Sequence, residues 1–417
     1  MNISNDNDLD SYFKNFYLLN QTLLFDKKET SVEKICINGT EVSKYINEYW
    51  TSGQRQASAI HEISYRACFK AELPRFFINL LTREGDTVYD PFIGRGTTII
   101  EAALLMRQII GNDINPLSKI LVYPRLNICK TADVEKRLNK IPRPHDLETN
   151  IDLSMFYHKK TASEIIALKD YFEERKQSGK EDVIDKWIRM VATNRLTGHS
   201  PGFFSVYTLP PNQAVTQESQ EKINIKRNQI PEYRDTHRLI LNKTISLLSD
   251  LTIEQINQIN SIGRKALLLT NESRNTKEIE SERVNLTVTS PPFLDIVQYS
   301  QDNWLRCWFN SIDVNEISKN ITIVKDINTW SSFIGDTFKE LFRITKRNGW
   351  VAFEVGELRK GTIKLDEFVV PIGIKAGFKA KAIIINEQKF TKTSNIWGIK
   401  NNKFGTNSNR IVLFRKE

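Results

Sequence analysis

The stretch that decides the fold is Thr87-Val-Tyr-Asp-Pro-Phe-Ile-Gly-Arg-Gly-Thr-Thr98, with Gln108-Ile-Ile-Gly-Asn-Asp113 shortly after it. Its first three residues predict a short strand, its two glycines predict a tight turn, and the residues from Thr97 to Arg107 predict a helix. The second quoted segment predicts another strand. A strand, a glycine turn, a helix and a strand in this order are typical of a parallel sheet covered by helices.

The strand pattern stops after about residue 128 and returns near Lys265. The later apolar segments predict strands at Ala266–Thr270, Val284–Thr289, Trp350–Val355, Ala380–Asn386 and Asn409–Phe414. The residues between the two sheet regions are mostly helical in pattern, and Thr161-x-x-Glu164 predicts the start of one of these helices. We therefore expect four parts: an N-terminal arm (1–60), a first part of the sheet domain (61–129), a mostly helical insert (130–262) and a second part of the sheet domain (263–417).

Composition limits the class of protein. The chain has 417 residues, of which 40% are hydrophobic, and no apolar run reaches the roughly 18 residues that a membrane-spanning helix needs. Without a signal-peptide pattern at its start, we expect a cytoplasmic protein with no membrane partner. The four cysteines are scattered with no Cys-x-x-Cys pair, so no metal site is expected. A net charge of +9 mildly favours a nucleic-acid partner.

The glycine turn predicts a cofactor site, because Gly94 and Gly96 let the backbone approach a ligand and the following helix presents free amide groups. A dinucleotide-binding turn would have a third glycine where Ile99 stands, and a phosphate-binding P-loop would have Gly-Lys-Ser or Gly-Lys-Thr. Both phosphate interpretations are therefore weakened. Asp113 ends the next predicted strand, where a carboxylate can accept hydrogen bonds from ribose hydroxyls.

A second motif, Thr289-Ser-Pro-Pro-Phe293, also follows an apolar strand. The two prolines hold the backbone extended, so the Ser290 hydroxyl and the Pro291 carbonyl can converge on one small polar group. Phe293 adds an aromatic face that suits a planar ring. A nucleobase amino group would fit this arrangement, with its hydrogens accepted by the two oxygens.

These two motifs resemble motif I (Asp-Pro-Phe-x-Gly-x-Gly-Thr-Thr) and motif IV (Ser-Pro-Pro-Phe) of the DNA amino-methyltransferases, which use S-adenosylmethionine. The serine form of motif IV resembles the cytosine-N4 branch. Tyr65 to Pro74 is similar to motif X. The resemblance implies a Rossmann-like class I methyltransferase sheet, an α/β fold, with an inserted target-recognition domain. It implies these catalytic residues: Ser290, Pro291, Pro292 and Phe293. It implies these cofactor-binding residues: Phe69, Asp90, Pro91, Phe92, Gly94, Gly96, Thr97, Thr98, Asp113, Ile114 and Asn271.

The order of the motifs is X, I, the insert and then IV, which is similar to the arrangement called alpha in this family. Two features differ from the family's pattern. The insert enters before the predicted strand Ala266–Thr270, whereas the usual target-recognition region follows that strand. Asn271 stands where the family often has an aspartate beside the adenine ring.

A base within a duplex cannot reach a pocket at the end of a sheet, so the enzyme must flip the base out or act on single strands, and a flipped base is expected. The insert is the candidate for contacting double-stranded DNA, because it carries a cluster of basic side chains. These are Lys222, Lys226, Arg227, Arg234 and Arg238. A solvated helix face explains any single one of them equally well.

The resulting prediction is methyl transfer to N4 of cytosine in double-stranded DNA, as in a restriction-modification system with a cognate restriction endonuclease as a partner. Adenine-N6 methylation, guanine-N2 methylation in RNA, and an inactive nucleic-acid-binding homologue remain alternatives. Methylation of ring carbon is disfavoured, because that chemistry uses a thiolate placed in a Pro-Cys pair and no cysteine here follows a proline.

Overall fold

The computed structural model describes residues 6–17, 29–50, 57–65, 68–208, 215–292, 303–314, 326–358, 363–387 and 408–417. Within these ranges no helix is both long and apolar enough to cross a membrane.

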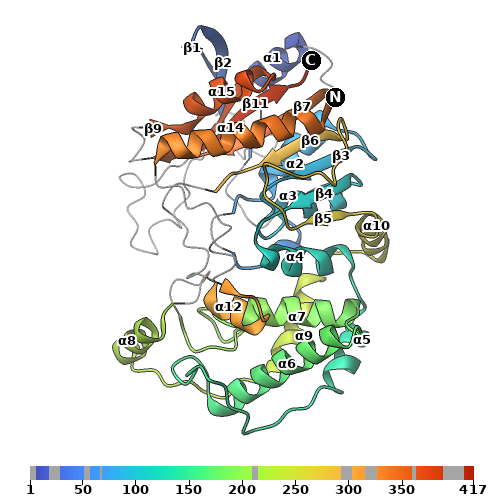
Figure 1. The fold of residues 1–417 in the computed structure, drawn as a ribbon, viewed down its shortest axis with the longest axis vertical. Helices are drawn as coiled ribbons and strands as arrows, with labels where there is room; N and C mark the ends of the chain where they lie inside the picture. Colours follow the sequence, from blue (N-terminus) through green and yellow to red (C-terminus); the bar gives the residue numbers. More distant parts are fainter. Residues whose placement is uncertain are drawn as a thin grey trace.

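Among the described residues, nine strands form one sheet in the order β1-β2-β10-β11-β7-β6-β3-β4-β5 (Figure 1). Their bounds are β1 (Ser31–Ile37), β2 (Thr40–Asn47), β3 (Thr87–Asp90), β4 (Gln108–Asn112), β5 (Leu267–Leu269), β6 (Val284–Thr289), β7 (Thr345–Val355), β10 (Lys379–Glu387) and β11 (Ser408–Arg415). Two further short strands, β8 (Glu357–Leu358) and β9 (Ile363–Lys364), pair with each other.

The central strands β7, β6, β3, β4 and β5 are parallel, so their carboxyl ends lie at one edge of the sheet. β11 is antiparallel to both β7 and β10. The order of strands reverses between β3 and β6, and in open parallel sheets ligands bind at such a switch point. The predicted Rossmann-like sheet is therefore confirmed, and the predicted strands coincide closely with β3 to β7, β10 and β11.

The strands β1 and β2 were not predicted. They form an antiparallel hairpin, and β2 pairs in parallel with β10, which extends the sheet at the side away from β5. The α-helix α1 (Asp6–Lys14) packs beside this hairpin, with a hydrogen bond of 2.5 Å from the Tyr45 hydroxyl to the Asp10 carboxylate.

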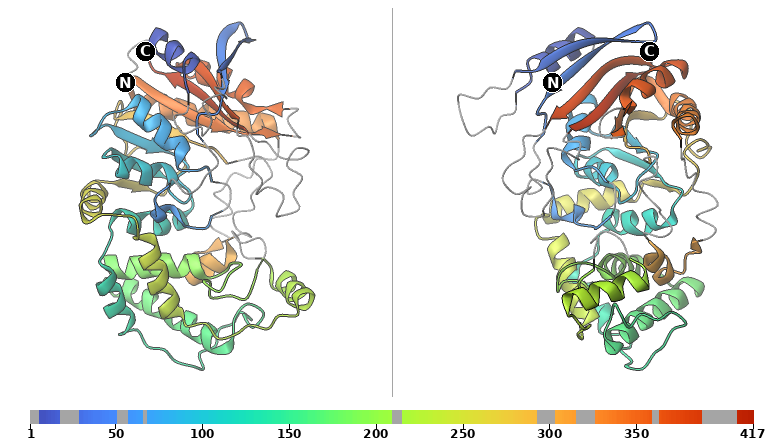
Figure 2. Two further views of the ribbon diagram at one scale, coloured as in Figure 1. Left: turned by 180° about the vertical axis from the view of Figure 1, so that it is seen from behind. Right: turned by 90° about the vertical axis from the view of Figure 1, so that its left-hand side faces the viewer.

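Helices cover both faces of the sheet (Figure 2). On one face, α2 (Glu72–Leu81) and α3 (Thr97–Leu104) share a buried apolar cluster with Val88, Val288 and Ala352. On the other face, α14 (Ile327–Ile344) and α15 (Leu365–Lys375) pack on Tyr89 and Phe353. Neighbouring side chains of β3 and β7 therefore point into two different apolar clusters, as expected of parallel strands that are covered by helices on both faces.

Helices follow β4 and continue until β5 begins. They are α4 (Pro116–Val122), η3 (Tyr123–Leu126), α5 (Thr131–Leu138), α6 (Lys159–Gln177), α7 (Val183–Arg195), α8 (Gln217–Arg227), α9 (Thr236–Leu247) and α10 (Ile253–Gly263). Short helices also occur elsewhere, at η2 (Ala59–His61) and α12 (Trp304–Phe309). The predicted start of a helix at Thr161 is wrong, because α6 begins at Lys159 with the His158 ring accepting from the Lys160 amide.

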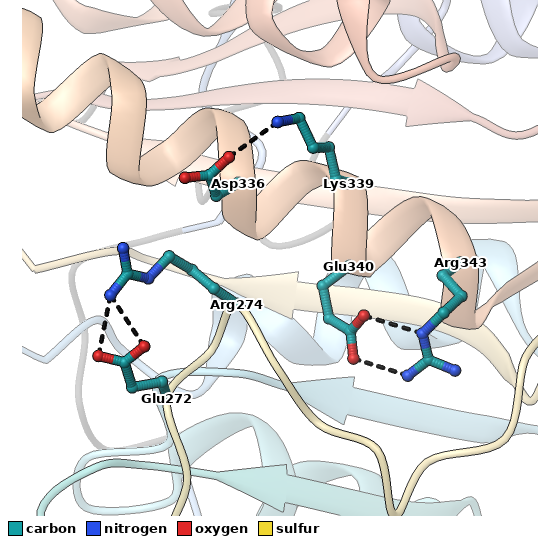
Figure 3. Close-up of a pocket in the computed structure, with 6 residues that line it drawn as sticks. All are labelled: Glu272, Arg274, Asp336, Lys339, Glu340 and Arg343. Atoms are coloured by element: carbon teal, nitrogen blue, oxygen red, sulfur yellow. Dashed lines mark hydrogen bonds and ion pairs between the residues drawn. The ribbon is translucent and has the colours of Figure 1, made fainter.

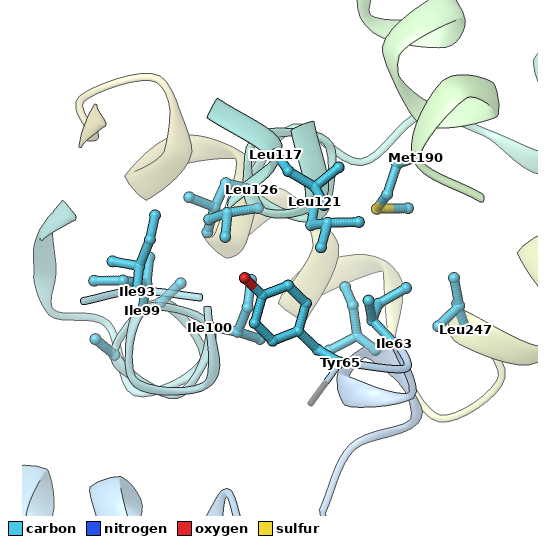
Figure 4. Packing of buried hydrophobic residues seen from close by; sticks show 14 of the residues in the cluster. Ile63, Tyr65, Ile93, Ile99, Ile100, Leu117, Leu121, Leu126, Met190 and Leu247 are labelled. Atoms are coloured by element: carbon cyan, nitrogen blue, oxygen red, sulfur yellow. The ribbon is translucent and has the colours of Figure 1, made fainter. Parts of the chain in front are cut away.

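The helical segment packs directly on the sheet domain. Figure 4 shows Tyr65 surrounded by Ile93, Ile99 and Ile100 on the side of α3 and by leucines of α4 and η3, with Met190 and Leu247 contributed by α7 and α9. One continuous apolar cluster therefore joins the glycine turn, the segment before α2 and the helical insert.

Candidate active site

The loop between β3 and α3 turns at two glycines that need the left-handed conformation. Gly94 has φ +47° and Gly96 has φ +83°, values that residues with side chains rarely adopt. A Cβ atom at Gly96 would lie 2.5 Å from Cγ2 of Val122, so α4 leaves no space for a side chain there. α3 begins at the next residue, so its unpaired amide groups lie at this loop.

Asp113 lies beside this loop at the end of β4. Its Oδ2 accepts from the Gly94 amide at 2.8 Å, and its Oδ1 accepts from the Asn115 amide at 2.9 Å. Burial raises the pKa of this carboxyl above its ordinary value, while the two amide hydrogen bonds lower it. Each oxygen of a carboxylate can accept about two hydrogen bonds, so a further donor on a ligand can be accommodated.

Arg95, between the two glycines, fastens the loop to the chain that precedes α2. Its guanidinium donates to three backbone carbonyls, those of His61 (3.4 Å), Ile63 (3.1 Å) and Phe69 (3.4 Å). A planar group with several fixed donors can bridge separate carbonyls in this way, which a lysine cannot. No feature of the sequence indicated this role.

A second arginine supports the first. Arg125 is fully buried, and its guanidinium donates to the carbonyls of Arg95 and Ile60. The neighbouring Tyr65 ring lies 3.4 Å from the position that a Cβ atom on Gly94 would take. The two arginines therefore hold the segment that resembles motif X against the glycine turn.

The Ser-Pro-Pro segment follows β6 directly. The Ser290 hydroxyl is buried and has no hydrogen-bond partner among the described residues. The Pro292 carbonyl accepts from the indole of Trp330 on α14 at 3.3 Å, which anchors the loop to the helix. Phe293, the last predicted catalytic residue, lies outside the described residues.

The two motifs meet at adjacent strand ends. β3 and β6 are parallel neighbours, and the Thr289 hydroxyl donates to Oδ1 of Asp90 at 2.6 Å. The Thr98 hydroxyl of α3 donates to the Val288 carbonyl at 3.1 Å. Asp90 is almost completely buried, and burial raises its pKa to about 7. The Asp90 carboxylate thus joins the two motifs from within the protein.

Sequence reasoning missed Glu354, which stands beside Ser290. In the register of β6 and β7, Val288 pairs with Ala352, and so Ser290 and Glu354 follow on the same face. Glu354 is buried, and burial raises its pKa, while the Ser290 hydroxyl and the Asn409 amide lower it. The amide of Asn409 donates to Glu354 at 3.1 Å, whereas the Ser290 hydroxyl lies close by without the geometry of a hydrogen bond. The detectable signal was a lone glutamate in an apolar strand.

The other predicted cofactor residues lie around the same strand ends. Asn271 follows β5, where its backbone exchanges two hydrogen bonds of 2.9 Å with the Asn112 side chain. Its own amide donates to Glu278 at 2.8 Å. Pro91, Thr97 and Thr98 are buried, and Phe69, Phe92 and Ile114 are partly exposed.

The predicted basic residues of the insert fall into two groups. Lys222, Lys226 and Arg227 are exposed on α8, and Arg238 is exposed on α9. Arg234 differs, because its guanidinium donates to the carbonyls of three residues in one loop. These residues are Ser200, Phe203 and Ser205. Arg234 therefore holds a loop of the protein.

A charged groove of about 510 Å³ lies between α14 and the residues that follow β5 (Figure 3). Each cation in it is paired with a neighbouring acid, as for Arg274 with Glu272 at 2.8 Å and Arg343 with Glu340 at 2.6 Å. The third pair joins Lys339 and Asp336 at 2.9 Å. This groove is neutralised by its own residues and has no excess charge for a polyanion.

Comparison with known proteins supports the same family. Residues 12–119 match the family model described as DNA methylase. The chain is 22% identical over 321 residues to the type II methyltransferase M.BsoBI of Geobacillus stearothermophilus, covering 69% of this chain and 60% of that protein. It is 24% identical over 322 residues to the type II methyltransferase M.MvaI of Kocuria varians, covering 71% and 66%. The chain thus spans about two thirds or less of these relatives, and its resemblance to the DNA amino-methyltransferases is confirmed.

Solved structures are also similar, at low scores. TrmN from Thermus thermophilus has a TM-score of 0.30 at 12% identity, covering 84% of this chain and 50% of that chain. The rRNA methyltransferase AviRa from Streptomyces viridochromogenes has a TM-score of 0.33 at 11% identity, covering 88% and 94%. The fold assignment therefore rests on the order and direction of the strands.

Proposed function

We propose that this relative of the type II DNA methyltransferases transfers a methyl group from S-adenosylmethionine to the exocyclic N4 of a flipped cytosine in double-stranded DNA. The observation that carries the proposal is the meeting of the Gly94–Gly96 turn and Ser290 at the ends of adjacent strands, joined by the bond from Thr289 to Asp90. A cognate restriction endonuclease is the partner expected of a type II modification enzyme.

The residues present fit the cofactor. Asp113 retains acceptor capacity at the end of β4, beside the half-buried Gly94. The aromatic ring of Tyr65 lies over the same glycine, and Arg95 holds that segment in place. When bound, S-adenosylmethionine supplies an electrophilic methyl group on a sulfonium. The family resemblance and the comparisons support this cofactor.

The target amine would be held by two oxygens of the Ser-Pro-Pro segment. The Ser290 hydroxyl has no other partner among the described residues, so its lone pairs are available to an incoming donor. The Pro292 carbonyl is already engaged by Trp330, which leaves the Pro291 carbonyl as the second acceptor. Accepting both amine hydrogens draws the nitrogen lone pair out of conjugation and towards the methyl group. Holding the reactants in line is the main catalytic contribution expected of such a site.

Glu354 would receive the proton that the amine loses. As the nitrogen–carbon bond forms and the sulfur–carbon bond breaks, the amine nitrogen becomes positively charged and one of its protons must leave. For this transfer the Ser290 hydroxyl would turn towards the neighbouring Glu354 carboxylate, accept the amine proton and pass its own hydroxyl proton to Glu354. The raised pKa of Glu354 makes it a better proton acceptor than an ordinary glutamate.

The direct test is to incubate the protein with duplex DNA and methyl-labelled S-adenosylmethionine, and then to digest the DNA to nucleosides for mass spectrometry. We expect labelled N4-methylcytosine, and about 100-fold slower labelling with the Ser290→Ala variant. Labelled N6-methyladenine would show that the target base is adenine and not cytosine. Label in RNA alone, or failure to bind the cofactor in calorimetry, would overturn the proposal.

A further inference from the structure

The insert carries a groove of about 480 Å³ that lies apart from the strand ends. One wall is the loop of residues 198–207, and the other is the segment of residues 228–234 that follows α8. The lining residues that matter for its chemistry are His199, Tyr207, Asn228, Gln229, Glu232 and Arg234. We call it the insert groove.

The loop wall is held rigid by the protein. Arg234 donates to three of its carbonyls, and the Thr208 amide donates to the Gly198 carbonyl at 3.0 Å. The guanidinium of the buried Arg195 lies 4.0 Å from the centre of the Phe203 ring. A Cβ atom on Gly198 would lie 2.3 Å from that ring, so only glycine fits there. A surface fixed in this way loses little conformational freedom when it binds a ligand.

Three polar side chains that line the groove are not engaged by hydrogen bonds or ion pairs with other described residues. Within the described part of the chain, His199, Asn228 and Glu232 make no side-chain hydrogen bond or ion pair, and all three are exposed. Gln229 is oriented instead, because its amide nitrogen donates to the Tyr207 carbonyl at 3.0 Å and to Asn224 at 2.8 Å. Amides and carboxylates are among the side-chain groups that recognise base edges by hydrogen bonding, and the imidazole of His199 can also donate or accept.

Cations flank the groove on the side of α8. Lys222, Lys226 and Arg227 are exposed on that helix, and no ion pair with another described residue neutralises them. Arg227 also lies 3.7 Å from the centre of the Tyr207 ring, which fixes its charge next to the groove. Polar side chains beside exposed cations suit duplex DNA. The cations can contact phosphates and set the position of the protein, while the polar side chains can contact base edges and give the specificity.

We propose that the insert groove reads base-pair edges of duplex DNA through His199, Asn228 and Glu232, with the cations of α8 on the adjoining phosphates. This proposal rests on the proposed function and names the part of the chain that selects the methylated sequence. In the charged groove of Figure 3, every cation is paired with an acid. The insert groove differs, because the side chains proposed to read bases have no such partner among the described residues and are available to a ligand.

The test compares three single variants with two controls. His199→Ala, Asn228→Gly and Glu232→Gln each remove one reading group, and glycine readily adopts the left-handed backbone of Asn228, whose φ is +46°. The controls, Glu254→Gln and Asn257→Ala, change exposed residues of α10. Each protein is expressed in a methylation-free host, and modified bases are mapped by sequencing the genome.

We expect the wild type and both controls to methylate one sequence motif. At least one groove variant should accept another base at a single position of that motif, with discrimination reduced about tenfold or more. Affinity for S-adenosylmethionine, measured by calorimetry, should stay within about twofold of the wild type, because the groove lies outside the cofactor site. Unchanged motifs and unchanged discrimination in all three variants would overturn the role of the groove.

A second measurement separates this inference from the proposed function. Purified protein is used to select bound duplexes from a random-sequence library, which requires no methyl transfer. Selection of one motif by the wild type and relaxed selection by the groove variants would support the groove even if no methylated base were found. If the wild type methylates DNA but all variants select the same duplexes as the wild type, the role of the groove would be overturned and the proposed function would stand. Selection of RNA over DNA would overturn both proposals.

Discussion

The hydroxyl of Thr289 donates a 2.6 Å hydrogen bond to the carboxylate of Asp90, joining the carboxyl ends of β6 and β3. The same carboxylate accepts from the Phe92 amide at 3.0 Å. One buried acid therefore fixes the start of the glycine turn and the start of the Ser-Pro-Pro segment relative to each other. The distance between the two halves of the site depends on this acid and not on a loop.

The stability of the protein should depend on the ionisation of Asp90. Burial raises its folded pKa to about 7 from an ordinary value of 3.8. The folded state thus binds the proton more tightly than the unfolded state, and stability falls as pH rises from about 4 through 7, by at most about 1.4 kcal/mol per pH unit. Asp90→Asn should remove this contribution. Urea unfolding at several pH values measures the free energy of unfolding of the wild type and of Asp90→Asn. If this free energy changes with pH equally in both proteins, the expectation is contradicted.

Ser290→Ala should reduce turnover about 100-fold while leaving the affinity for S-adenosylmethionine nearly unchanged, because only the target amine loses an acceptor. The matched control is Thr287→Val on the same strand, since the Thr287 hydroxyl is also buried without a partner. This control should retain full activity. Loss of cofactor binding in Ser290→Ala would show that the halves of the site are wrongly assigned.

The pH dependence of turnover should report Glu354. A proton acceptor must be ionised, and a raised pKa means that turnover falls with decreasing pH at a higher pH than for an ordinary glutamate. Asn409→Ala should move this acidic limb to still higher pH, because the Asn409 amide lowers the pKa of Glu354. Glu354→Gln should lower turnover about 100-fold or more and abolish the limb. An unchanged profile in Asn409→Ala would exclude Glu354 as the titrating group.

Two glycines with equal backbone angles separate strain from steric overlap. Gly85 has φ +82° with open space around it, whereas Gly96 has φ +83° and faces Val122 at 2.5 Å. Substitution by alanine should cost about 1–2 kcal/mol of strain at each site and about 1–3 kcal/mol more at Gly96 from overlap. Denaturant unfolding measures the difference, and Val122→Ala should restore part of it. Equal losses at the two glycines would show that α4 shifts freely.

Arg95 should act on cofactor affinity through the segment that it holds. Removing its three carbonyl contacts in Arg95→Ala frees the chain around Tyr65 and Phe69, so we expect about tenfold weaker binding of S-adenosylmethionine, worth about 1.4 kcal/mol. Arg95→Lys should not rescue it, because a point charge cannot bridge three carbonyls. Arg264→Ala, at an exposed position, serves as the control. If Arg95→Ala binds S-adenosylmethionine with wild-type affinity, the three carbonyl contacts of Arg95 do not contribute to cofactor binding.

The sheet could be predicted because its strands are short apolar runs between clear turn signals. The hairpin β1–β2 could not, since the residues of β1 are mostly exposed and its two charged residues, Glu33 and Lys34, are adjacent, so the segment shows no alternation of polar and apolar side chains. The start of α6 was misplaced for a related reason. Thr161 and Glu164 have a capping pattern, yet they are buried and bond to residues 234 and 236, a long-range contact that no local pattern contains.

The candidate site was predictable where chemistry is concentrated in one motif. Gly94, Gly96, Asp113 and Ser290 each occur in a local signature. The roles proposed for Glu354 and Arg95 depend on which strand or segment lies beside them, and this neighbour is set by the order of the strands. Arg234 shows a further limit of the sequence, because its charge suggested DNA contact while the three carbonyls that accept from it are distant in sequence and could not be predicted.

The two ends of the helical insert are clasped together where they leave and rejoin the sheet. The Asn260 side chain accepts from the Ile128 amide at 2.6 Å and donates to the Ile128 carbonyl at 3.0 Å. Gly263 approaches Leu126 so closely that a Cβ atom would lie 1.8 Å from its carbonyl oxygen. Because the two ends of the insert are held together, insertions or deletions within the insert need not disturb the strands of the sheet. The same scaffold could then carry a different reading module, and a lineage could acquire a new target sequence without rebuilding its chemistry.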